Sequence, residues 1–493
     1  MYFMEVALGQ YSQLGPISVW KLAPIAKGVG AAMVLISLLV SIYYNVIMGY
    51  TLFYIFASFR SEVPWAKCHE WWGADEHCYE RDVNVTILPH CKTLIKKGLP
   101  FQPGIMVDDV FVPATLGRKY VLHLKPDGLD EPFQLGEIRW DLALCLLLSW
   151  IIVFLCLMKG VKSSGKVVYF TATFPYVILI ALLVRGVSLE GAEKGIRALF
   201  IPKWEELLSI QVWRKAAEQM FFSLSVSWGG LIMFGSYNEF QNRVHIDAMI
   251  VSSLDFLTSI IAGVVVFSVL GHLAHVLQVD VFDVAQDGQG LAFVAYPEAI
   301  ALLPIPQLWA VLFFFMLYTL GLDSEFAMLE NLLTAISDEF PSTRKHRVYL
   351  CAIACIICFF LGLPCVTEAG QYVLDLMDTF GGGVGIMIIA VCELIGIMWI
   401  YGVRRFSDDL HFMLDLRPNI FIRASWLLIS PLTLAVSLLT LLSLSSPLFL
   451  FRLHLGKCGK IGLDGRIDVK MYAARNLGNY EGLSDESWHQ CNS

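Results

Sequence analysis

The chain has 493 residues, of which 57% are hydrophobic and only 16% are charged. This balance, with a mean hydropathy of +0.63, excludes an ordinary soluble globular protein of this size and indicates an all-α polytopic membrane protein. The net charge of −8 decides little, because the placement of charges sets the topology of a membrane protein more than their sum does.

The first part of the chain contains the end of one span and then a complete span. Residues 1–18 are apolar and resemble the end of a span that lacks its beginning. The apolar run Gly28–Phe59 is long enough for one spanning helix with some tilt. A polar segment, residues 60–137, follows, and its composition predicts a long loop outside the membrane.

This long loop carries two features that are typical of an extracellular segment. Asn84 begins an Asn-Val-Thr sequence, which is an acceptor for N-glycosylation. Cys68 and Cys78 lie in a Trp-rich stretch at a spacing that suits a disulfide in an oxidising space. We therefore expect both modifications in this loop.

Further apolar runs predict eight more spans, at residues 138–158, 167–184, 212–242, 248–276, 307–336, 348–366, 372–401 and 420–450. The short loops rich in lysine and arginine all fall on one side of the membrane, which the positive-inside rule places in the cytoplasm. The outer connection at residues 280–306 is expected to be helical in pieces. We predict a transmembrane domain over residues 1–455 and a soluble tail over residues 456–493.

The span at residues 212–242 is predicted to break in its middle. Its centre is crowded with small residues of low helical propensity: Ser223, Ser225, Ser227, Gly229 and Gly230. Non-helical backbone persists in lipid only where it lines a cavity or is buried in protein, so such a break indicates a binding site. A face of small residues that lets helices pack closely is the alternative, and both interpretations remain open here.

Ionisable residues inside spans are costly and mark functional candidates: Asp255, Asp323, Glu325, Glu330 and Glu393. Asp323 is followed by Ser324, and a carboxylate beside a hydroxyl offers hard oxygen ligands to a small cation. A hydrogen bond between helices is the alternative for each residue taken alone. The chain contains no Gly-rich phosphate loop after a strand, no GxSxG and no HExxH, and no repeated pore loop, which argues against an enzyme and a channel.

Ordered motifs across residues 1 to about 440 resemble neurotransmitter:sodium symporters of the solute carrier 6 family. They are MEVALGQYSQLGP, SIYYNVIMGYTLFYIFASF, KGVKSSGKVVYFTATFPYV, FFSLSVSWGGLIMFGSYNEF, YTLGLDSEF, SDEFP and YGVRRFSDDL. The resemblance is to the amino-acid branch, similar to glycine and proline carriers and to insect nutrient amino-acid transporters. It implies an inverted-repeat bundle with broken helices that works by alternating access. By that comparison the chain is incomplete at both ends, without the family's first and twelfth helices.

The resemblance implies two sodium sites and a chloride site. The second sodium site resembles Leu320, Asp323 and Ser324, and the first resembles Ser223 with Asp255. Most relatives have an asparagine where Asp255 stands. The chloride site resembles Gln219, Ser223 and Ser259, but its usual tyrosine is expected at Phe3, which has no hydroxyl. Whether transport depends on chloride is therefore left open. The negative charge of Asp255, which lies nearby, is a candidate substitute for the chloride ion.

The resemblance also implies a substrate pocket and two gates. The pocket residues are Val40, Tyr44, Phe222, Ser225, Trp228 and Met328. The indole of Trp228 narrows such a pocket, which favours small or compact amino acids. Asp378 resembles the acid of an outer gate, and Tyr237 with Asp338 resembles an inner gate. The arginine partners of both gates are expected in segments that this chain lacks.

These observations predict a sodium-coupled symporter that carries amino acids or related small amines across the plasma membrane. The alternative is a transport-inactive form that associates with a full-length relative and regulates it. We expect no enzymatic activity, no cofactor besides the coupling ions sodium and chloride, and no nucleic-acid partner. The sequence does not decide which substrate is carried, the ion stoichiometry or whether the chain associates with itself or with relatives.

Overall fold

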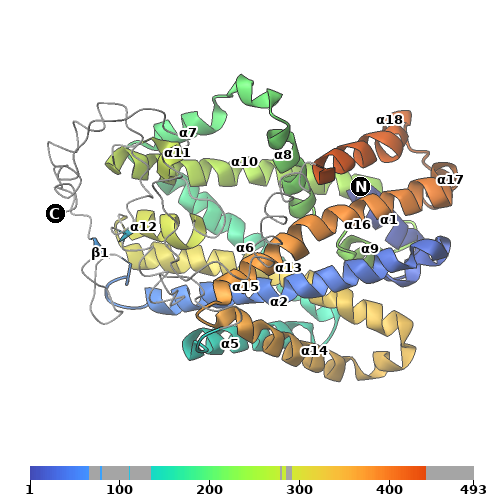
Figure 1. Ribbon diagram of the computed structural model, residues 1–493, viewed down its shortest axis with the longest axis horizontal. Coiled ribbons are helices and arrows are strands. Elements are labelled where there is room, and N and C mark those ends of the chain that lie inside the picture. Colours follow the sequence, from blue (N-terminus) through green and yellow to red (C-terminus); the bar gives the residue numbers. More distant parts are fainter. Residues whose placement is uncertain are drawn as a thin grey trace, which may run out of the picture. The chain divides into compact units, whose positions relative to one another are not determined.

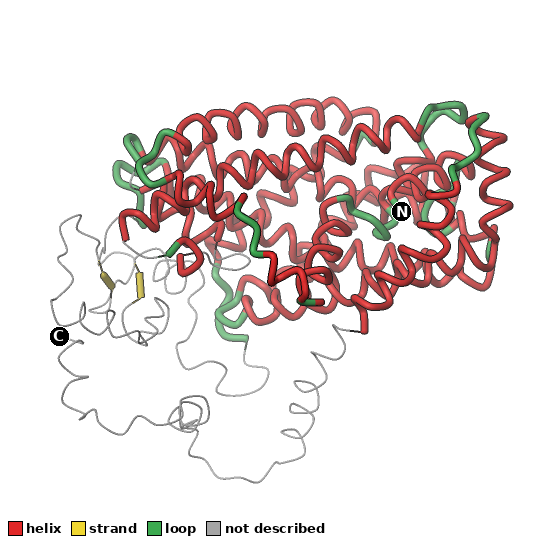
Figure 2. Tube along the Cα trace, turned by 90° about the horizontal axis from the view of Figure 1, so that it is seen from above, coloured by secondary structure: helices red, strands yellow, loops and turns green. Residues whose placement is uncertain are grey.

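The computed structural model describes residues 1–65, 78–79, 110–111, 135–277, 280–284, 291–301 and 303–439. Helices make up nearly all of this part, as Figure 2 shows. They are α1 (Tyr2–Ser12), α2 (Lys27–Ser58), α5 (Trp140–Leu157), α6 (Val161–Val187), α7 (Ala192–Phe200), α8 (Ile210–Ser223), α9 (Gly230–Ser236), α10 (Val244–Leu277), α11 (Val281–Val284), α12 (Tyr296–Ala301), α13 (Pro306–Glu339), α14 (Arg347–Gly362), α15 (Gly370–Met377), α16 (Ile386–Leu394), α17 (Val403–Leu414) and α18 (Ile420–Ala424). Two short strands, β1 (Cys78–Tyr79) and β2 (Val110–Phe111), pair in parallel.

Eight helical segments of the described part are long and apolar enough to cross a membrane. They are Pro24–Ser58, Trp140–Leu157, Gly165–Val187, Val244–Val276, Pro306–Glu339, Pro341–Val366, Gly370–Leu414 and Ile420–Leu439. Each overlaps one of the predicted spans, which confirms the all-α polytopic class. The outer connection is also helical in pieces where it is described, at α11 and α12.

The remaining predicted span is the broken one, and the structure confirms the break. α8 ends at Ser223 and α9 begins at Gly230, and the residues between them form turns. Figure 1 shows α8 and α9 as two separate helices. Ser225 and Ser227 have φ angles of 51° and 68°. Residues with a side chain rarely adopt this left-handed region, so the turn is held against an intrinsic cost of about 1–3 kcal/mol per residue.

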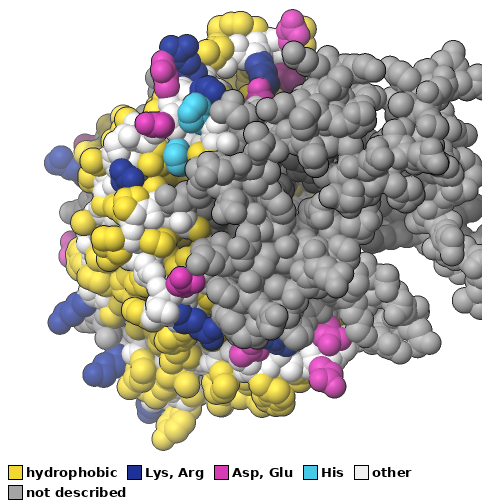
Figure 3. Space-filling view, turned by 90° about the vertical axis from the view of Figure 1, so that its left-hand side faces the viewer, with side chains coloured by type: hydrophobic (Ala, Val, Ile, Leu, Met, Phe, Trp, Pro, Cys, Tyr) yellow, Lys and Arg dark blue, Asp and Glu magenta, His cyan; other side chains and the backbone are white. Residues whose placement is uncertain are grey.

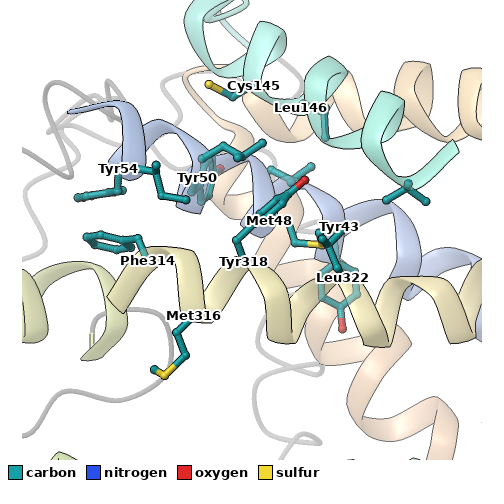
Figure 4. Packing of buried hydrophobic residues seen from close by; sticks show 14 of the residues in the cluster. Tyr43, Met48, Tyr50, Tyr54, Cys145, Leu146, Phe314, Met316, Tyr318 and Leu322 are labelled. Atoms are coloured by element: carbon teal, nitrogen blue, oxygen red, sulfur yellow. The ribbon is translucent and has the colours of Figure 1, made fainter. Parts of the chain in front are cut away.

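A large core lies between α2 and α13 and extends to α5, α6 and α14. Figure 4 shows Tyr54 of α2 close to Phe314 of α13. Their rings stack at a centroid distance of 4.8 Å, and both side chains are fully buried. Stacked aromatic rings of this size bury much apolar area, so they fix α2 and α13 as neighbours.

A second core joins α1, α9, α16 and α17. In it, α1 and α9 meet backbone to backbone. A Cβ atom on Gly9 would lie 2.1 Å from the carbonyl oxygen of Ile232, and one on Gly235 would lie 2.4 Å from that of Val6. Only glycine permits this approach, as at other small-residue crossings of membrane helices.

Apolar side chains are also prominent on the outside of the described part. Figure 3 shows hydrophobic side chains over much of the described surface in that view. Only 6% of the most apolar window of Val244–Val276, which belongs to α10, is buried. An apolar surface of this kind is suited to lipid rather than water.

Some predictions concern residues outside the described ranges. Cys68 and Asn84 lie there, so the disulfide with Cys78 and the glycosylation remain predictions. The proposed tail, residues 456–493, lies there as well, so the division into a transmembrane domain and a tail also remains a prediction.

Candidate ion and substrate site

The two residues predicted for the first sodium site are brought together by the end of α8. Ser223, the last residue of α8, donates a hydrogen bond from Oγ to Oδ1 of Asp255 on α10, at 2.5 Å. A bond to a charged acceptor at this distance is among the stronger kinds. The break therefore begins directly after Ser223, the residue of α8 that is hydrogen-bonded to the intramembrane carboxylate of Asp255.

The residues predicted for the second sodium site lie together on α13. The side chains of Leu320 and Ser324 are one turn apart and both are exposed. Asp323 accepts a hydrogen bond from Thr171 Oγ1 of α6, and Tyr44 of α2 lies beside Ser324. Carboxylate, hydroxyl and backbone carbonyl oxygens are the ligands that a hard monovalent cation prefers, so this donor set fits sodium.

The residues predicted for chloride lie near the same break. Gln219 and Ser223 are one turn apart on α8, and Ser259 lies one turn after Asp255 on α10. All three predicted chloride residues have exposed side chains. Phe3 stacks on Trp426 at a centroid distance of 5.8 Å, so its ring packs in the second core.

The predicted substrate residues divide between the core and the break. Val40, Trp228 and Met328 belong to the same buried cluster, and Tyr44 packs at its edge. Phe222 meets Trp228 edge to face at 5.5 Å, whereas Ser225 is exposed in the break. Phe222 and Trp228 therefore form an aromatic pair next to the exposed Ser225.

Asp378, the acid predicted for the outer gate, lies near Tyr43 and Phe222. Asp378 accepts a hydrogen bond from the hydroxyl of Tyr43 at 2.8 Å. A Cβ on Gly382 would lie 2.8 Å from the Tyr43 hydroxyl and 3.2 Å from both Phe222 and Asp378. Asp378 opens a π-helical stretch, Asp378–Gly385, and such irregular turns are frequent at functional sites.

The residues predicted for the inner gate meet at the end of α13, to which Asp338 belongs. The hydroxyl of Tyr237 is 3.0 Å from that of Thr334. Asp338 accepts bonds from the backbone N–H of Gly15 and from Arg344 Nη2, each at 2.8 Å. The expectation that Asp338 lacks an arginine partner in this chain is wrong, because the 3₁₀ turn after α13 returns Arg344 to it.

Sequence reasoning missed several residues that support the site. Thr171 and Asn331 were not singled out, yet Thr171 bonds Asp323 and Asn331 Nδ2 donates to the carbonyl of Trp228 at 2.9 Å. Glu5 was not singled out either, although it bonds the break directly. A glutamate inside the apolar stretch YFMEVALG was the available signal for Glu5.

A broken helix beside intramembrane carboxylates, within a bundle of apolar helices, is an arrangement typical of membrane transporters. The model of the sodium:neurotransmitter symporter family matches residues 1–453, and the chain belongs to this family. Members of the family are transporters, which confirms that the protein is not an enzyme.

Three relatives illustrate the similarity. The sodium- and chloride-dependent glycine transporter 2 of Xenopus laevis is 43% identical over 449 residues, covering 87% of this chain and 56% of the relative. The sodium- and chloride-dependent neutral and basic amino acid transporters B(0+) of Mus musculus and Homo sapiens are 47% identical over 459 residues and 45% identical over 465 residues. These two matches cover 89% and 88% of this chain, and 70% of each relative. The chain thus spans 56% to 70% of the length of these relatives.

Proposed function

We propose that the protein is a sodium-coupled symporter of amino acids in the plasma membrane. The observation that carries this proposal is the Ser223–Asp255 bond, which ties the broken helix to a charged residue of α10. The oxygen cluster at Asp323 and Ser324 supports a second sodium ion. The names of the relatives, which describe glycine and neutral or basic amino acid transport, support the substrate class.

Within this class we propose compact amino acids as substrates. Trp228 and Phe222 meet edge to face, and Trp228 is 92% buried, so the indole cannot swing away without disturbing the core. A rigid indole reduces the room for a bulky side chain. Glycine, alanine and proline are therefore expected to be carried better than tryptophan.

Uptake of radiolabelled amino acids into cells that express the chain tests the proposal. We expect uptake in sodium chloride medium and its loss when choline replaces sodium. Asp255→Asn is the informative variant, because it keeps the size of the side chain and removes its charge. If the charge of Asp255 replaces chloride, wild-type uptake should persist when gluconate replaces chloride in the medium, and uptake by the variant should require chloride. Strict chloride dependence of both proteins would contradict the idea that Asp255 replaces chloride.

The alternative is a transport-inactive form that binds a full-length relative. The exposed positions of Gln219, Ser259, Leu320 and Ser324 favour it, because ion ligands in a working site are normally enclosed. Delivery to the cell surface without uptake, together with reduced uptake by a co-expressed relative, would support this role and refute autonomous symport.

A further inference from the structure

One side chain of α13 is hydrogen-bonded to the break at the residue that carries the indole. Asn331 is fully buried, and its Nδ2 donates a hydrogen bond to the backbone carbonyl of Trp228 at 2.9 Å. A carbonyl that lies outside a helix within a membrane finds no water to bond, so the protein itself must supply its partner. Asn331 is this partner for Trp228.

The amide of Asn331 also packs against the next residue of the break. Gly229 has a φ angle of 81°, and a Cβ atom there would lie 3.1 Å from Asn331 Nδ2 and 3.3 Å from Asn331 Oδ1. The same Cβ would lie 3.0 Å from Cβ of Pro16, which follows α1. The backbone at Trp228 and Gly229 is therefore confined between α13 and the segment after α1.

The indole of Trp228 has no polar anchor of its own. Its Nε1 is buried and has no hydrogen-bond partner among the described residues. Its edge-to-face contact with Phe222, at 5.5 Å, adds only a modest preference for one orientation. The direction of the indole therefore depends on the backbone that carries it, and Asn331 fixes the carbonyl of that backbone.

We propose that Asn331 is a positioning residue that fixes the indole of Trp228 and thereby determines how large an amino acid side chain the candidate pocket accepts. In this role Asn331 acts through Trp228 rather than by contact with the substrate. Met328 of the predicted pocket lies one turn earlier on α13, so the same helix carries both residues. The effect on selectivity rests on the proposed function, whereas the restraint on the break does not.

Hydrogen–deuterium exchange of the purified full chain in lipid nanodiscs tests the restraint on the break. Asn331→Leu keeps the approximate size of the side chain and removes both polar atoms of the amide. Because an unpaired buried carbonyl is costly, the amides of residues 225–230 should exchange at least about tenfold faster than in the wild type. Asn45→Leu is the matched control, since Asn45 is also fully buried but is bonded to Ser149 in the core between α2 and α5, and it should leave this exchange unaltered.

Uptake of leucine and of alanine tests the selectivity. In Asn331→Leu the indole is no longer held through its backbone, so the pocket gains room for a longer side chain. The ratio of leucine to alanine uptake, each measured as Vmax/KM, should rise about tenfold, chiefly through a lower KM for leucine, because room for one methylene group changes selectivity by a factor of this order. Asn45→Leu should leave the ratio unaltered even where it lowers the amount of folded protein.

Three outcomes would overturn the proposal. They are unaltered exchange in a folded Asn331→Leu protein, faster exchange with an unaltered leucine-to-alanine ratio, and equal changes in Asn331→Leu and Asn45→Leu. Absence of uptake by the wild type would refute the proposed function and the selectivity that rests on it, and the exchange result would still decide whether Asn331 restrains the break.

A second variant covers the case in which Asn331→Leu does not fold. In Asn331→Thr the hydroxyl can bond the backbone of its own helix, so no polar group is left unpaired on α13. The threonine side chain is shorter than the amide and loses the bond to the Trp228 carbonyl. Faster exchange of residues 225–230 is therefore expected in Asn331→Thr as well, and unaltered exchange in this variant would also contradict the role of Asn331.

Discussion

The contact between Gly9 of α1 and α9 gives a sharp test of the packing around the break. In Gly9→Ala the new Cβ would lie 2.1 Å from the Ile232 carbonyl oxygen and 2.9 Å from its carbon, and both are backbone atoms that no rotamer change can move. Ordinary contact begins at 3.4 Å, so the two helices must separate by about 1.3 Å. Overpacking of this kind lowers the free energy of unfolding by about 1–3 kcal/mol. Here the displacement also strains the turn that precedes α9.

Thermal stability in detergent, followed by fluorescence-detected size exclusion, measures this cost. Gly9→Ala should lower the midpoint by several degrees relative to the wild type. Gly230→Ala is the matched control on α9, because its Cβ would meet nothing within 4 Å. Equal midpoints for Gly9→Ala and Gly230→Ala would refute the backbone-to-backbone contact.

Two further substitutions test individual bonds. Thr171→Ala removes the hydroxyl that donates a hydrogen bond to Asp323. A hydrogen bond to a charged group contributes about 1.5 kcal/mol, so the sodium concentration for half-maximal uptake should rise about tenfold. Thr173→Ala is the control, because the hydroxyl of Thr173 donates a hydrogen bond only to the backbone of its own helix, and it should leave that sodium concentration unaltered. An equal shift in both variants would argue for a general effect on α6. Glu330→Gln leaves the partly buried Arg347 without its counter-charge and should lower the free energy of unfolding by about 1–3 kcal/mol, so an unchanged thermal midpoint would show that the pair is dispensable.

The break could be predicted from the sequence because its cause is local. Serine and glycine have low helical propensity wherever they occur, so their crowding after Ser223 marks the end of α8 without knowledge of the neighbours. The positions of the spans followed in the same way from apolar runs of membrane length.

The partners of the site residues could not be predicted in that way. Thr171 and Asp323 are 152 positions apart, and no periodicity relates them. Glu5 and Glu393 meet only because α1 and α16 enclose the same turn. Arg344 is close to Asp338 in the sequence, but the family resemblance directed attention to an arginine outside the chain.

The glycine crossing of α1 and α9 has a mechanical consequence. Helices joined through side chains can slide as rotamers adjust, whereas helices in backbone contact at Gly9 and Gly235 cannot. Gln10 adds to this, because its amide donates to the carbonyls of Phe240 and Asn242 just beyond α9. Any tilt of α9 must therefore move α1 with it, so the two helices are expected to behave as one rigid unit.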